Sequence, residues 1–65
     1  MMSDFSNLTE GMKLTFNNGL FTAVATIEKV VDNQAFVGEK RRYIVKTEKG
    51  YTSIISPSEV LVLCE

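Results

Sequence analysis

A chain of 65 residues has room for one small domain, and 45% of its residues are hydrophobic. A domain of this size buries about 60% of the surface that its unfolded chain exposes, so its core depends on nearly every large apolar side chain. Seven basic and eight acidic residues give a net charge of −1. This balance excludes a strongly basic nucleic-acid-binding protein and a strongly acidic mimic of nucleic acid.

The N-terminal residues are polar around one aromatic side chain. Residues 1–7 contain Phe5 as their only aromatic residue, and we expect them to form a tail that docks by this ring. The segment has neither the basic region nor the apolar run of a signal peptide. We therefore expect a domain over residues 8–65 and a cytoplasmic location.

The first two strands are predicted from alternation and composition. Met12, Leu14 and Phe16 share one face of a half-buried strand over 11–17. An Asn-Gly pair follows, which is typical of a two-residue hairpin turn. The next segment, 20–31, is rich in Thr, Val and Ile and predicts a second strand.

The alternation of the second strand is imperfect. One face holds Phe21, Ala23, Ala25 and Ile27, and the other holds Leu20, Val24 and Val30. A bulge near residues 23–25 would allow both sets to be buried in different places. A helix over 22–31 is the alternative interpretation of the same residues.

The last third of the chain predicts two strands, one helical turn and a final strand. Gly50 suits a tight turn between strands over 41–48 and 51–56. Ser56, Pro57 and Glu59 are the N-cap, first-position and third-position residues of a helix start. The apolar run 60–64 follows too soon for more than one turn, so we expect a strand there. This run is far shorter than the ~20 residues that cross a bilayer, and we expect no membrane partner.

Residues 50–60 resemble the end of an SH3 domain, and residues 11–16 with their hairpin resemble the opening of KOW and Tudor-like small barrels. This resemblance implies an all-β, five-stranded antiparallel SH3-like barrel with one single-turn 3-10 helix, at 57–59, before the last strand. The chain has no tryptophan, and the tyrosine usual in the one-turn helix of peptide-binding SH3 domains is missing. Binding of proline-rich peptides is therefore not implied.

The core is expected to collect the inward-facing apolar residues of all five strands and of the segment before them. We expect it to contain Leu8, Met12, Leu14, Phe16, Val24, Ile27, Val45, Ile54, Val60 and Leu63.

The residue types that support catalysis or metal binding are missing. There is no histidine, and Cys64 is the only cysteine, so the sequence offers no zinc ligand set, no disulfide and no base for a serine nucleophile. A lone cysteine suits a reducing compartment. The four glycines are isolated turn residues, not a phosphate-binding loop. We expect no enzymatic activity, no cofactor, no metal ion and no small-molecule substrate.

A basic segment with aromatic neighbours is the first candidate binding surface. Cations interleaved with rings suit nucleic acid, because charge binds phosphates and rings stack on bases. The other interpretation is a solvated strand whose charges protect a sheet edge. The residues are Lys40, Arg41, Arg42, Tyr43, Lys46 and Tyr51.

An apolar pair in the longest connection is the second candidate. Phe36 and Val37 lie in a segment that should be polar, and an exposed apolar pair can anchor a partner protein. A short extra strand or a lid over the barrel end would explain the pair equally.

We expect a non-enzymatic protein-binding or accessory module, such as a phage-type modulator of a host protein. Phe36 would be its anchor, and Arg41 and Arg42 would orient the partner. The alternative is a nucleic-acid-binding small barrel of KOW or Tudor type that uses the basic residues of 40–49. A homo-oligomer formed through a strand edge is a third hypothesis.

Overall fold

Five strands and one short 3-10 turn make up the computed structural model, which describes residues 5–32 and 41–64. The elements are β1 (Lys13–Asn17), β2 (Thr22–Asp32), β3 (Arg41–Thr47), β4 (Thr52–Ile55), η1 (Pro57–Glu59) and β5 (Val60–Cys64). Each bound lies within two residues of the prediction, so the strand pattern is confirmed and the helical alternative for 22–31 is wrong.

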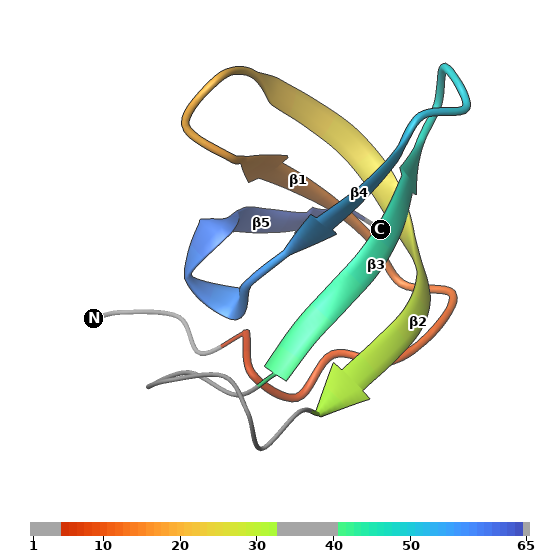
Figure 1. Cartoon of the computed structure of the whole chain (residues 1–65), viewed down its shortest axis with the longest axis vertical. Helices are drawn as coiled ribbons and strands as arrows, with labels where there is room; N and C mark the ends of the chain where they lie inside the picture. Colours follow the sequence, from red (N-terminus) through yellow and green to blue (C-terminus); the bar gives the residue numbers. More distant parts are fainter. Residues whose placement is uncertain (1–4, 33–40, 65) are drawn as a thin grey trace.

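All five strands belong to one antiparallel sheet with the order β4-β3-β2-β1-β5. Figure 1 shows that the sheet curves strongly around its interior, with η1 joining the two outermost strands. Among the described strands, no hydrogen-bonded ladder joins β4 to β5, so the sheet remains open between them.

A bulge in β2 allows both halves of this long strand to face the interior. The register with β3 shifts between Ile27 and Lys29, so Glu28 is the extra residue. Ala25 and Ile27 are buried before the bulge, whereas Val30 packs against the core after it. The prediction of a bulge near residues 23–25 is wrong, because the inward face changes from odd to even positions only after Ile27.

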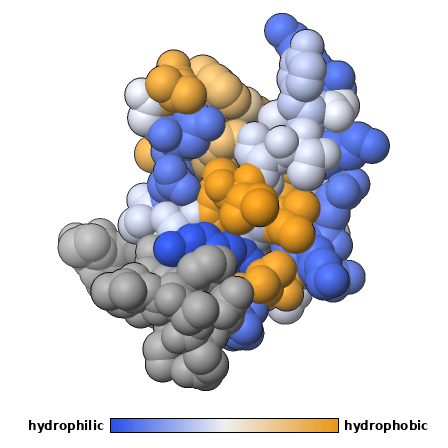
Figure 2. All heavy atoms as spheres, viewed as in Figure 1, coloured by the Kyte–Doolittle hydropathy of each residue, from blue (hydrophilic) through white to orange (hydrophobic). Residues whose placement is uncertain are grey.

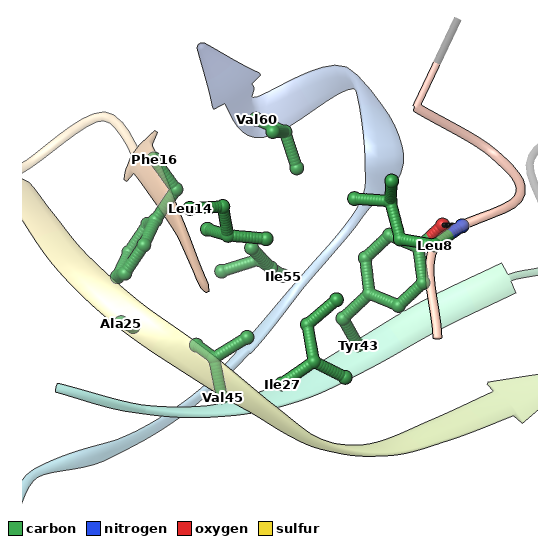
Figure 3. Close-up of a cluster of buried hydrophobic side chains, with 9 residues drawn as sticks. All are labelled: Leu8, Leu14, Phe16, Ala25, Ile27, Tyr43, Val45, Ile55 and Val60. Carbon is green, nitrogen blue, oxygen red and sulfur yellow. Dashed lines mark hydrogen bonds between the residues drawn. The ribbon is translucent and has the colours of Figure 1, made fainter. Parts of the chain in front are cut away.

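The interior is a cluster of nine buried apolar residues drawn from every strand and from the segment before β1. Figure 3 shows their side chains converging between the strands. Six of the predicted core residues belong to it and two more pack against it. The buried set is Leu8, Leu14, Phe16, Ala25, Ile27, Tyr43, Val45, Ile55 and Val60, and the predicted residues that pack against it are Met12 and Leu63.

Two predicted core residues face the other way. Ile54 is 66% exposed, and Ile55 is buried in its place. The register explains this, because Ile55 lies opposite the inward-facing Tyr43 and Ile54 lies opposite the outward-facing Ile44. Val24 is half-buried and does not belong to the core cluster.

The hydroxyl of Tyr43 fastens the N-terminal segment to the core. This side chain is fully buried, and its hydroxyl donates a hydrogen bond to the Phe5 carbonyl and accepts one from the Leu8 N–H at 3.2 Å. Phe5 packs against the core, as expected for a tail that docks by its ring. Both backbone groups thereby gain a partner within the protein.

The β3–β4 turn is fixed by Thr47 and Gly50. The N–H of Thr47 donates to the Tyr51 carbonyl at 2.7 Å, and the Thr47 hydroxyl accepts from the Tyr51 N–H at 3.1 Å. Gly50 has φ +92°, a conformation that other residues rarely adopt. The predicted role of Gly50 is therefore confirmed, and the backbone at Tyr51 is held in place.

The start of η1 also follows the prediction. The Glu59 carboxylate accepts a hydrogen bond from the Ser56 N–H at 2.8 Å, and Pro57 is buried at the first helical position. The turn ends at Glu59, and β5 begins at the next residue.

Replacing Tyr43 by phenylalanine should destabilise the protein by about 1–3 kcal/mol, because one buried and one part-buried backbone group lose their partner while the ring is retained. Urea unfolding at equilibrium measures this free energy. Tyr51→Phe is the matched control, since this ring is exposed and its hydroxyl makes no hydrogen bond with the described residues. Equal unfolding midpoints for the two variants would show that the Tyr43 hydroxyl does not stabilise the fold.

Candidate functional site

The turn between β1 and β2 exposes two large apolar side chains. Its conformation is set by Asn18, whose side-chain oxygen accepts hydrogen bonds from the N–H groups of Leu20 and Phe21 at 2.9 and 3.1 Å. Leu20 is 87% exposed and Phe21 46%. The hairpin predicted from the Asn-Gly pair is confirmed, but the last β1–β2 pair is Asn17 with Thr22, so the turn is longer than the two residues left between the predicted strands. The side-chain bonds of Asn18 stabilise a longer turn of four residues.

A groove of about 430 Å³ lies between the β1–β2 turn and the β3–β4 turn. Figure 1 shows the two turns at the same end of the molecule. Residues 22–24 of β2 line the groove together with Phe21 from one turn and with Glu48, Lys49 and Tyr51 from the other. We call this surface the hairpin groove.

The two aromatic rings of the hairpin groove stand on a well-fixed backbone. Phe21 packs edge-on against the buried Phe16, with ring centroids 6.1 Å apart and an interplanar angle of 62°. Tyr51 is 68% exposed, but its N–H and carbonyl are both bonded to Thr47. These rings can therefore contact another molecule with little loss of backbone freedom.

One backbone edge along the groove has no strand partner. Residues 22–24 of β2 pair with β1, where Val24 lies opposite Thr15. The ladder with β3 begins only at Ala25, opposite Thr47. No described strand therefore pairs with the other edge of residues 22–24, because β3 has already ended in its turn.

The charges at the rim of the groove are unequal. Lys13 and Glu48 form an ion pair at 3.1 Å, which stabilises the fold little because both side chains are well exposed. The positive charge of Lys13 nevertheless offsets the negative charge of Glu48 in the net charge of the rim. Lys49 is exposed and forms no ion pair within the described part of the chain. The rim therefore presents one net positive charge.

Arg41, which the sequence suggested as a partner-binding residue, holds three parts of the fold together. Its Nε and Nη2 donate to the two carboxylate oxygens of Asp32 at 2.8 and 3.1 Å, and its Nη1 donates to the Ser6 carbonyl. Hydrogen bonding from Arg41 holds the pKa of Asp32 below its ordinary value of 3.8, and the same contact raises the pKa of Arg41. The guanidinium thus links the end of β2, the start of β3 and the N-terminal segment.

Among the remaining predicted binding residues, those that the structure describes differ in their exposure. Tyr43 was expected among the surface aromatics but is fully buried, because it lies on the inward face of β3. Lys46 and Tyr51 are exposed, and the half-buried Arg42 donates to the Arg41 carbonyl. The other three predicted residues lie outside the described part of the chain and are Phe36, Val37 and Lys40.

Sequence analysis missed Leu20 and Phe21 as surface residues. The signal was available, since two large apolar residues directly follow an Asn-Gly pair, but the predicted two-residue turn placed both of them in β2. Figure 2 shows hydrophobic side chains over the β1–β2 turn and a second group over β3 and β4, where Ile44 and Ile54 lie opposite each other.

Comparison with models of protein families, with curated proteins and with solved structures finds no match for this chain. The described residues hold no group of three or more side chains placed to bind a metal ion. Within the same residues, no helix has the length and apolar character needed to cross a membrane.

Acidification should remove the stabilisation that comes from Asp32. Because its pKa is lower in the folded protein, the ion pair stabilises the fold above pH 3.8 and is lost as the pH falls through the folded-state pKa. Urea unfolding should show wild type more stable than Asp32→Asn at neutral pH, with the difference vanishing in acid. Glu28→Gln is the control, since it removes an exposed carboxylate that forms no described ion pair. A difference that persists at low pH would contradict this role of Asp32.

Proposed function

We propose that this chain is an SH3-like small barrel that binds another protein and has no catalytic activity. The curved antiparallel sheet supports the barrel, as does the single helical turn between its last two strands. The binding surface in this proposal is the hairpin groove together with Leu20.

The observation that carries the proposal is the exposure of Leu20, Phe21 and Tyr51 at adjoining turns beside a concave surface. A 65-residue domain needs its large apolar side chains inside, so keeping three of them in water forgoes stabilisation that the fold could use. Clustered exposed apolar residues mark interaction sites. Aromatic rings are also enriched in the buried centre of protein interfaces.

The ionisable side chains support a binding role over catalysis. Asp32 is bonded to Arg41, Glu48 to Lys13, and Glu59 to the backbone of η1. A general acid or base needs a carboxylate directed into a pocket with a shifted pKa. Among the described carboxylates, Asp32 has a lowered pKa, and the cause is its exposed ion pair with Arg41 at the end of β2.

A protein partner suits the groove better than nucleic acid does. A nucleic-acid surface would combine several uncompensated cations with exposed rings. Arg41 is engaged by Asp32, and Tyr43 is buried. The groove itself combines two rings with aliphatic residues of β2 and one cation, Lys49, which has no ion-pair partner among the described residues.

Tyr51→Ala should weaken the binding of the partner protein at least tenfold, because a large exposed ring at an interface centre commonly contributes more than 1.4 kcal/mol. The full chain serves as bait in a lysate of its source organism, with chemical cross-linking. The recovered protein is then purified, and its affinity for wild type and variant is measured by calorimetry.

Ile54→Ala is the matched control, because its side chain is as exposed as that of Tyr51 but lies on β4. It should leave the affinity unchanged. A partner that binds the Tyr51→Ala variant as tightly as wild type would overturn the role of the groove. Recovery of nucleic acid alone, with a salt-sensitive complex in a gel shift, would favour the nucleic-acid alternative.

A further inference from the structure

We infer that the hairpin groove binds an extended segment of the partner protein as an added strand on β2, with an apolar side chain between Phe21 and Tyr51 and an acidic side chain beside Lys49. This inference rests on the proposed function and specifies the mode of binding and the chemistry of the ligand. Three independent features of the groove carry it.

The first feature is the unpaired backbone edge of residues 22–24. These residues already have strand geometry, because they pair with β1 from Asn17 to Thr15. Their other edge lines the groove and has no described strand beside it. Three residues span about 10 Å, which allows a short segment to pair through main-chain hydrogen bonds.

The second feature is the pair of aromatic rings. Side chains alternate along an added strand, so every second side chain of the segment would point into the groove. Phe21 and Tyr51 come from the two turns that bound it. The volume of about 430 Å³ is sufficient for one large apolar side chain and its backbone.

The third feature is the charge at the rim. The charge of Glu48 is offset by its ion pair with Lys13, whereas Lys49 is exposed and has no described ion-pair partner. An acidic residue next to the apolar anchor would complement Lys49, and a basic residue would be repelled. Electrostatic complementarity of this kind contributes specificity and a faster association rate.

The competing interpretation is a dimer in which a second copy of the chain pairs with β5, a strand at the edge of the sheet. β5 is wholly apolar and Val62 is 54% exposed. However, the register of β5 shifts at a bulge beside Thr15 and Phe16. Bulges twist an edge away from further pairing, and none of the residues that line the hairpin groove comes from β5. The observations therefore favour β2 as the docking edge.

Selection from a displayed library of random linear peptides, about twelve residues long and without cysteine, tests the inference on the full chain. We expect enriched peptides to share an apolar residue with an acidic residue close to it. Their affinity should fall at least tenfold for Tyr51→Ala and stay unchanged for Ile54→Ala. Circular dichroism checks that both variants are folded.

Charge reversal tests the role of Lys49. Selection against the Lys49→Glu variant should enrich peptides with a basic residue at the position where wild type enriches an acidic one. Methylation of single backbone amides in a selected peptide tests strand addition. Methyl groups at alternate residues should abolish binding, and those at the intervening residues should not.

Several results would overturn the inference. They are the absence of enriched peptides, equal binding to Tyr51→Ala, an unchanged consensus with Lys49→Glu, and tolerance of every amide methylation. A dimer of the full chain that dissociates in the Tyr51→Ala variant would show that a second copy occupies the groove. If the folded partner requires Tyr51 but no peptide binds, the inference fails while the proposed protein-binding function stands.

Discussion

The bulge at Glu28 in β2 determines which side chains this short chain can bury. Without the extra residue, Val30 would face outward if Ala25 and Ile27 faced the core. The bulge reverses the alternation, so that both halves of β2 contribute to a single interior. It also bends the strand, which allows one sheet of five strands to surround its own core. Residues 5–32 and 41–64 contain a single sheet and one helical turn, so no second layer among them could supply the missing burial.

Polar contacts extend this core to the N-terminal segment. Tyr43 bonds to Phe5 and Leu8 from inside, and Arg41 bonds to Ser6 and Asp32 beside it. Arg41 and Tyr43, which the sequence suggested as binding residues, thus attach the N-terminal segment to the rest of the fold. The surface that we propose for a partner lies at the opposite ends of β2 and β3, where the two turns carry exposed rings beside an edge that no described strand pairs with.

The five strands were predictable because alternation and turn residues are local properties of the sequence. Choosing between Ile54 and Ile55 for the core was not, since neighbouring isoleucines fit either face. The register beyond Gly50 decides between them. The burial of Tyr43 and the contact of Arg41 with Asp32 depend on pairing between β2 and β3, which residue types alone do not reveal. The hairpin groove depends on the hydrogen bonds of the Asn18 side chain. These bonds stabilise a four-residue turn, whereas the Asn-Gly pair suggests a turn of two residues.

The Asp32–Arg41 contact has a consequence for how the sequence can change over time. These two residues pair at the end of the β2–β3 ladder and are also joined through their side chains. The two ends of the intervening segment are therefore anchored independently of its length. Doubling the length of chain between two fixed ends costs only about 0.6 kcal/mol in closure entropy. Natural variants of this protein should accordingly accumulate insertions and deletions between these anchors while the paired strands keep their length.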